Sequence, residues 1–96
     1  MKINLKSLKF TAKEELKEFV QEKVSKLSRF NDKIISAEVT LFLEDTKLPD
    51  NKVCEIKLVV PGNDDFVKKT AVSFEEAILS SVETMQTILQ RKKERA

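Results

Sequence analysis

The side chains of this sequence that could do chemistry are mainly its cations, because the usual catalytic residues are scarce. The chain carries 18 lysines and arginines but no histidine, one cysteine and one glycine. Without histidine it lacks the commonest general base and metal ligand. Cys54 alone can form neither an internal disulfide nor a cysteine zinc site, and a lone Gly62 excludes a glycine-rich phosphate loop. Because the acidic residues form no paired-carboxylate pattern, we expect no enzyme activity, no metal, no cofactor and no small-molecule substrate.

The densest group of cations stands at the C-terminal end of an amphipathic segment. Ser73 and Glu76 have the spacing of a capping box, which predicts a helix over residues 73–95. Its apolar residues recur in steps of three and four: Phe74, Ala77, Ile78, Val82, Met85, Ile88 and Leu89. The basic run at its end is Arg91, Lys92, Lys93 and Arg95. Two interpretations of this run stay open: it complements the negative end of the helix dipole, or it binds phosphates.

Length and composition predict one folded domain over residues 1–96. The sequence is 41% apolar and 35% charged, which is typical of a folded rather than a disordered chain. The net charge is only +2, so binding to nucleic acid would need cations gathered at one place. The N-terminal residues do not have the pattern of a signal peptide, and no run approaches the roughly 20 apolar residues of a membrane span. We therefore expect a cytoplasmic protein without a membrane partner.

A first strand and a first helix are predicted in the N-terminal third of the chain. Apolar and polar residues alternate over residues 2–8, which is typical of a strand. Thr11 and Glu14 form a second capping-box pattern, so we expect a helix from near Ala12 to residues 28–31. The buried stripe of this helix should be Leu16, Phe19, Val20, Val24 and Leu27.

Further cations accompany these elements. Lys23 and Lys26 flank the stripe of the first helix, and Arg29 stands near its end. Lys68 and Lys69 are neighbours in a later strand, so they should point to opposite faces of the sheet. The ordinary interpretation of such lysines is that their long stems cover the edge of the core while their ammonium groups reach water.

Three strands are predicted between the two helices. The inward residues of the first should be Ile35, Ala37, Val39, Leu41 and Leu43. Residues 45–51 contain Pro49, Asp50 and Asn51 and predict a hairpin loop. The inward residues of the next strand should be Cys54, Ile56, Leu58 and Val60, so we expect Cys54 to be a buried core residue. Residues 61–64 predict a turn, and residues 66–72 a last short strand.

These elements predict an α+β fold with the order β-α-β-β-β-α. Successive strands joined by short loops should form an antiparallel meander. The first strand returns through a helix and should therefore pair parallel with a neighbour. Because each helix has one apolar stripe, the two helices should pack on one face of a four-stranded mixed sheet. The other face should keep Glu38, Thr40, Glu55 and Lys57 in water.

Four stretches, taken in order, carry a resemblance to a known family. They are MKINLKS at the start, EFVQEKVSKLSRF in the first helix, AEVTLFL in the second strand, and FVKKTAVSFEEAILSSVETMQTILQRKK at the end. Together they span almost the whole chain. The chain resembles the short form of the ribosome hibernation promoting factors and ribosome-associated inhibitors, also called sigma-factor modulation proteins. It departs from them in the last helix, where Thr84 and Thr87 occupy positions at which a basic residue is common.

This resemblance implies a ribosomal partner. Members of the family bind the small ribosomal subunit in the channel used by messenger RNA and the anticodon ends of transfer RNA, and they block translation in stressed or stationary cells. Their basic side chains contact ribosomal RNA phosphates. Carried over position by position, the implied RNA-binding residues are Lys23, Lys26, Arg29, Lys69, Arg91 and Lys93, with weaker claims for Lys33, Lys68 and Lys92.

Two other functions stay open at this stage. A double-stranded RNA-binding module has a similar core, but its lysines stand at the start of the last helix, where this chain has Glu75 and Glu76. A protein-interaction domain could instead pair through the edge of the last strand, or through Phe42 and Val59 on the open sheet face. Self-association belongs to this second alternative.

Overall fold

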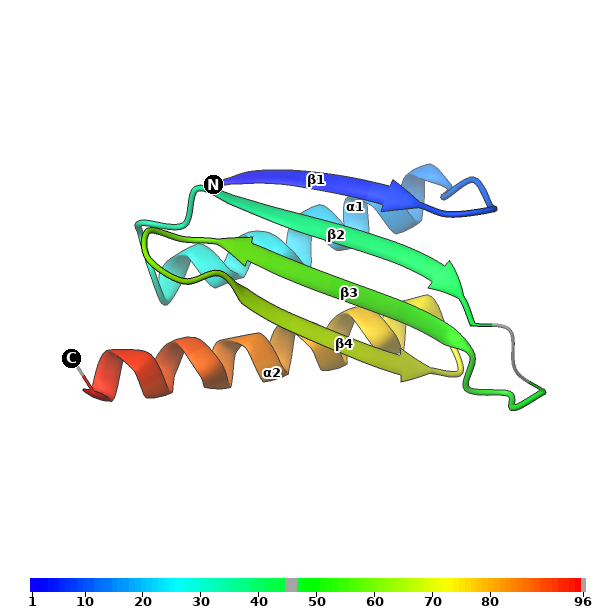
Figure 1. The fold of residues 1–96 in the computed structure, drawn as a ribbon. Coiled ribbons are helices and arrows are strands. Elements are labelled where there is room, and N and C mark those ends of the chain that lie inside the picture. The colour runs from blue at the N-terminus through cyan, green and yellow to red at the C-terminus, as the bar shows by residue number, and fades with distance from the viewer. Residues whose placement is uncertain (45–46, 96) are drawn as a thin grey trace.

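The structure, a computed structural model, describes residues 1–44 and 47–95, and its elements follow the predicted order (Figure 1). The strands and helices are β1 (Lys2–Ser7), α1 (Glu14–Ser25), the short 3-10 helix η1 (Lys26–Arg29), β2 (Ser36–Leu43), β3 (Lys52–Val59), β4 (Asp65–Ala71) and α2 (Phe74–Arg95). The predicted α+β class and the β-α-β-β-β-α order are therefore confirmed.

The sheet has the spatial order β1-β2-β3-β4, with one parallel and two antiparallel pairs. β1 pairs parallel with β2, with Lys2 opposite Ser36, because α1 carries the chain back along the sheet between them. β2, β3 and β4 form the predicted antiparallel meander. In the β3–β4 turn Gly62 has a φ of 99°, a backbone conformation that favours glycine. The predicted β2–β3 loop includes residues 45 and 46, which lie outside the described residues.

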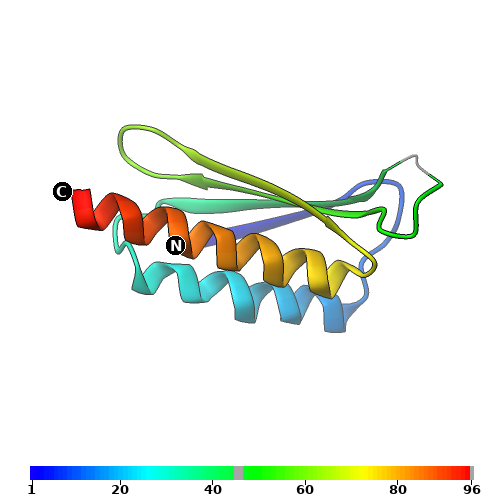
Figure 2. The ribbon, with the colours of Figure 1, turned by 90° about the horizontal axis from the view of Figure 1, so that it is seen from below.

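Both helices cover the same face of the sheet and run in the same direction (Figure 2). Their predicted stripes meet the inward residues of the strands in one hydrophobic core. Val20, Val24 and Leu27 of the first stripe are fully buried, while Leu16 and Phe19 are partly buried. Because the helices are parallel, the C-terminal end of η1 and the C-terminal end of α2 lie at the same end of the molecule (Figures 1 and 2).

The start of α1 differs from the prediction. The helix begins at Glu14, its N-cap residue is Lys13, and no side chain among the described residues caps it, so the expected capping box from Thr11 is wrong. The preceding segment is instead held by a tertiary contact. The Phe10 ring stacks on the Phe74 ring, with 4.8 Å between centroids and 13° between planes. Packing of this kind outweighs a local capping preference and sets where the helix starts.

The start of α2 agrees with the prediction, since the Glu76 amide donates a hydrogen bond of 3.1 Å to Ser73 Oγ. Further along α2 the buried Ser81 hydroxyl donates to the carbonyl oxygen of Cys54 at 3.3 Å, which joins helix to sheet. Cys54 is fully buried, as expected. Burial raises the pKa of its thiol to about 11, so the thiol stays protonated at neutral pH and belongs to the core.

Two residues that the alternation placed inward in β2 are exposed. Ala37, Val39 and Leu41 are buried, but Ile35 is 60% exposed and Leu43 is 53% exposed. Ile35 precedes the first residue of β2, and Leu43 is its last residue. The pattern identified the correct face, but the packed helices cover only the middle of the strand, so the prediction is wrong for its two ends.

Candidate nucleic-acid interface

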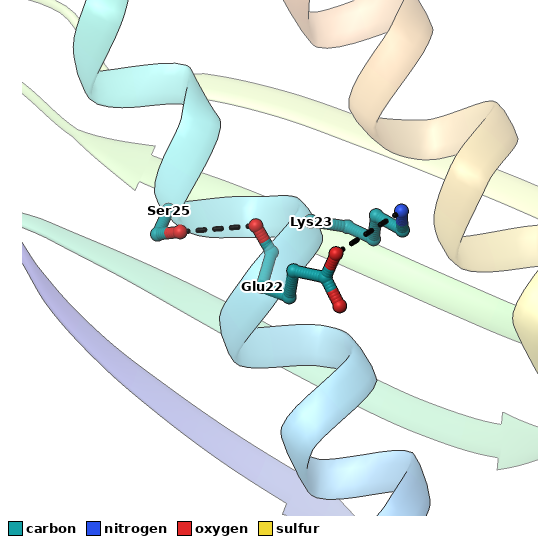
Figure 3. Close-up of polar contacts among 3 residues, drawn as sticks. All are labelled: Glu22, Lys23 and Ser25. Carbon is teal, nitrogen blue, oxygen red and sulfur yellow. Dashed lines mark hydrogen bonds and ion pairs between the residues drawn. The ribbon is translucent and has the colours of Figure 1, made fainter.

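Lys23 and Lys26 lie where α1 and η1 face α2. Both line a shallow pocket of about 420 Å³ between the two helices, and the rest of its lining comes from α2: Leu79, Val82, Glu83 and Gln86. Figure 3 shows the Lys23 side chain extending from α1 toward α2. The predicted position beside the buried stripe is therefore confirmed, and both residues line the helix–helix boundary.

The surroundings of Lys23 hold its ammonium group loosely. Its side chain is 25% exposed, and its Nζ lies 3.6 Å from Glu22 Oε1 and 5.5 Å from the centroid of the Phe19 ring. Ser25 Oγ donates to the Glu22 carbonyl at 3.0 Å, so Glu22 is held at both its backbone and its side chain (Figure 3). The Glu22 carboxylate is 64% exposed, and an ion pair in water of this kind is weak. A phosphate group can therefore compete with Glu22 for Lys23.

Arg29 and Lys93 meet at the C-terminal ends of the helices. Both line a pocket of about 550 Å³ between residues 28–33 and the last turns of α2. Both also line a second pocket, of about 600 Å³, together with Phe30, Gln90 and Glu94. Lys23, Lys26, Arg29 and Lys93 thus lie along the boundary of α1 and η1 with α2. We call these four residues the interhelix surface.

Arg91 and Lys69 lie apart from the interhelix surface. Arg91 follows the buried Leu89 by two positions, or about 200° around a helix of 3.6 residues per turn, so it faces solvent on the outer side of α2. Lys69 stands opposite Cys54 in the sheet register, on the helix-covered face of the edge strand β4. Since α1 packs against β1 and α2 against β4, α2 separates Lys69 from α1 (Figure 1). Two of the six implied residues are therefore not brought together with the other four.

Two of the weaker candidates are already engaged in contacts. Lys92 Nζ forms an ion pair with Asp65 Oδ1, and the Asp65 side chain is only 9% exposed. This pair ties the last turns of α2 to the start of β4. Lys68 lies on the open sheet face, where its Nζ is 3.0 Å from Glu44 Oε1 and 5.8 Å from the centroid of the Phe42 ring. Lys92 lines the 550 Å³ pocket beside Arg29 and Lys93 while it is paired with Asp65, whereas Lys68 lies on the opposite face of the sheet.

Lys33 was only a weaker candidate for RNA binding in the sequence analysis, but the structure places it with two of the main candidates. It lines the 550 Å³ pocket together with Arg29 and Lys93. Its amide donates to Asn31 Oδ1 at 2.9 Å, which shapes the turn after η1. Its position in the short connection that follows the first helix could have indicated this, because such a connection folds back beside the helix end.

Carboxylates are interspersed with these cations. Glu83 lines the pocket of Lys23 and Lys26, Asp32 lines the 550 Å³ pocket at the helix ends, and Glu94 lines the 600 Å³ pocket there. They lower the positive potential of the surface. Binding of a polyanion at this surface should therefore depend strongly on salt.

The described residues offer few other functional groups. No cluster of three or more histidine, cysteine, aspartate or glutamate side chains among them is arranged to hold a metal ion. None of the helices in residues 1–44 and 47–95 is long and apolar enough to cross a bilayer.

These features define a two-layer α+β domain, with a four-stranded mixed sheet, two parallel helices on one face, and cations along the boundary between the helices. The profile of the sigma 54 modulation protein / S30EA ribosomal protein family matches residues 3–96. The chain belongs to this family of ribosome-associated proteins, and the family resemblance seen in the sequence is confirmed. No curated protein sequence matches the chain.

Two solved structures show the same fold. The N-terminal domain of Protein Y from Thermus thermophilus superposes with a TM-score of 0.81 at 24% identity, over 95% of this chain and 98% of that one. A ribosomal subunit interface protein from Coxiella burnetii superposes with a TM-score of 0.86 at 14% identity, over 98% of this chain and 99% of that one. At these identities the likeness establishes the architecture, and the chemistry has to be argued from the residues of this chain.

Proposed function

We propose that this protein binds ribosomal RNA of the small ribosomal subunit in the channel used by messenger RNA and transfer RNA, and thereby inhibits translation in stressed or stationary cells. The observation that carries the proposal is the gathering of Lys23, Lys26, Arg29 and Lys93 on one surface of a chain from a ribosome-associated family. The similar Coxiella burnetii protein is described as a ribosomal subunit interface protein, which supports the same partner. On this proposal the protein acts in the cytoplasm without catalysis.

The physical basis of binding is the neutralisation of RNA phosphates. Each lysine or arginine that contacts a phosphate releases a condensed counterion, and the gain in entropy supplies most of the affinity. Contacts of this kind follow the backbone and shape of the RNA, because helical RNA exposes few readable base edges. Once bound, a domain whose longest dimension is 43 Å fills the space that messenger RNA and transfer RNA need.

Salt dependence is the first quantitative expectation. If each of the four cations neutralises one phosphate, log affinity should fall against log salt with a slope of about −2.8 to −3.6. Raising the salt from about 50 to about 200 mM should then weaken binding to small subunits about 50- to 150-fold. An affinity that stays constant over this range would exclude phosphate neutralisation as the mechanism.

The decisive experiment is co-sedimentation of the protein with purified ribosomal subunits. The variant K23E/K26E should remain in the supernatant, with an affinity lower by about tenfold or more, because two attractions become repulsions. The matched control is K2E/K6E, which makes the same change in net charge on the exposed residues of β1, on the face away from the helices. The control should sediment with small subunits and inhibit cell-free translation like the wild type.

Three outcomes would contradict the proposal. The first is equal loss of binding in both variants, which would indicate an effect of net charge alone. The second is tighter binding to a plain RNA duplex than to the small subunit, which would favour a duplex-binding module. The third is binding to the subunit without any inhibition of cell-free translation.

A further inference from the structure

The pocket of about 550 Å³ at the helix ends combines an apolar surface with cations. It lies between residues 28–33 and the last turns of α2, and its size falls within the range of roughly 300–1,000 Å³ that is usual for small-ligand sites. Its apolar lining comes from Phe30 and Leu89. A site that only neutralises phosphates has no need of an aromatic ring among its cations.

Phe30 is the aromatic residue shared by the two pockets at this end. It lines both of them, and Arg29 and Lys93 also line both. The ring is partly buried against the core, while the rest of it faces the pockets. An aromatic surface is thus bordered by an arginine from η1 and a lysine from α2.

The local hydrogen bonds hold this arrangement in place. The Phe30 amide donates to the Leu27 carbonyl at 3.0 Å, which closes the last turn of η1. The Lys33 amide donates to Asn31 Oδ1 at 2.9 Å, which fixes the following turn. On the opposite side, the ion pair of Lys92 with Asp65 holds the end of α2 against β4. The pocket is therefore formed before any ligand binds.

We propose that this pocket binds one unpaired nucleotide of RNA, with the base against Phe30 and its flanking phosphates on Arg29, Lys33 and Lys93. This inference rests on the proposed function in taking RNA as the ligand, and it adds recognition of a base to the contacts with phosphates. The base must be unpaired because a base inside a helix has both faces covered by its neighbours. Proteins that bind single strands combine a cationic groove with aromatic side chains in this way.

The test compares unpaired and paired RNA on the same protein. In the variant F30L the apolar volume that packs against the core is largely kept, but the aromatic face is lost. We expect F30L to bind a short single-stranded RNA about 5-fold or more weakly than the wild type, while its affinity for a blunt duplex stays within about twofold. The control is F66L, since Phe66 is 57% exposed on β4, away from the pocket, and this variant should match the wild type with both RNAs.

A second measurement needs no variant of the protein. A single-stranded RNA that carries 2-aminopurine should lose fluorescence when its base stacks in the wild-type pocket. The same RNA with an abasic nucleotide in place of that base should bind more weakly by a similar factor to F30L. Equal binding of the intact and abasic RNAs to the wild type would overturn the inference, and so would a loss in F30L that is the same for duplex and single strand.

The outcomes separate this inference from the proposed function. If the wild type does not sediment with small subunits but binds single strands through Phe30, the proposed function fails and the nucleotide pocket stands. If the wild type sediments and inhibits translation while F30L is indistinguishable from it with every RNA, the pocket fails and the proposed function stands.

Discussion

Lys92 and Lys93 are neighbours in sequence with opposite expected roles, and replacing each by alanine separates them. Both lysines line the 550 Å³ pocket, but Lys92 pairs with the nearly buried Asp65 and ties α2 to the sheet, whereas Lys93 also lines the 600 Å³ pocket with Arg29. Both substitutions remove one positive charge from the end of the same helix and introduce the same helix-favouring residue. We expect K92A to reduce stability and K93A to reduce RNA binding.

The expected cost of K92A follows from the burial of its partner. Removing one member of a fully buried ion pair costs about 3–5 kcal/mol, because the other charge is left unpaired. The Asp65 side chain is 9% exposed but that of Lys92 is 49% exposed, so water already screens part of the interaction. Asp65 Oδ2 also has no hydrogen-bond partner among the described residues, so little else would support the carboxylate. We therefore expect K92A to lose about 1–2 kcal/mol, and K93A to stay within about 0.5 kcal/mol of the wild type.

The assay for stability is urea unfolding followed by circular dichroism, with thermal melts as a second readout. A loss of about 1–2 kcal/mol in a domain of this size should lower the Tm of K92A by about 5–15 °C. Binding to small subunits is then measured at a temperature where both variants are folded. There K93A should lower the slope of log affinity against log salt by about 0.7–0.9, the contribution of one phosphate contact.

Equal stability of the two variants would refute the reasoning, because it would mean that the Asp65 carboxylate does not need Lys92. A K92A variant that folds normally and loses more RNA affinity than K93A would refute the assignment of Lys93 to the interhelix surface. The double variant D65N/K92A serves as a check, since removing both charges should recover part of the stability lost in K92A.

The other predictions concern stability, measured by the same urea unfolding. Burial raises the pKa of the Cys54 thiol from 9.0 to about 11, so between these pH values the folded state keeps a proton that the unfolded chain loses. The free energy of unfolding should therefore be undiminished below pH 9 and fall by about 2–3 kcal/mol toward pH 11. The variant Cys54→Ala should not show this fall. Ser73→Ala should cost about 1 kcal/mol because it removes the cap of α2, whereas Thr11→Ala should cost less than about 0.5 kcal/mol; equal losses would contradict the two helix starts. Met85→Ala should cost about 2–5 kcal/mol, because Met85 is fully buried, and Leu79→Ala clearly less, because Leu79 is 45% exposed.

The elements of the fold could be predicted because each leaves a local pattern. Apolar residues recur in steps of three and four along residues 73–95 and alternate with polar residues in the strands. These two patterns identified the faces that the structure shows to be buried. The predictions that were wrong concern places where tertiary contacts determine the local structure. Thr11 does not cap α1, since the stacking of Phe10 on Phe74 holds the preceding segment. Ile35 and Leu43 fit the alternation but lie at the ends of β2, where no helix covers them.

The candidate site was less accessible from the sequence. Assigning cations by position treated Arg91, Lys92 and Lys93 as one basic run, but successive residues of a helix point about 100° apart. One therefore faces solvent, one turns to Asp65 and one joins Arg29. The proximity of Lys33 to Arg29 and Lys93 depends on how the chain folds back after η1. The spacing rules for helices do not describe that turn, so the sequence did not predict it.

The parallel pairing of β1 with β2 also has a consequence for how the chain assembles. Asn4 Nδ2 donates to Glu38 Oε1 at 3.2 Å across 34 residues of sequence, whereas the β2, β3 and β4 strands are joined by short hairpins. Closing a long loop costs more entropy than closing a short one, and α1 must already lie across the sheet before β1 can reach its place. Although β1 is synthesised before β2, it should accordingly be the last of the four strands to find its partner, and its amides should be among the first to exchange when the native protein opens.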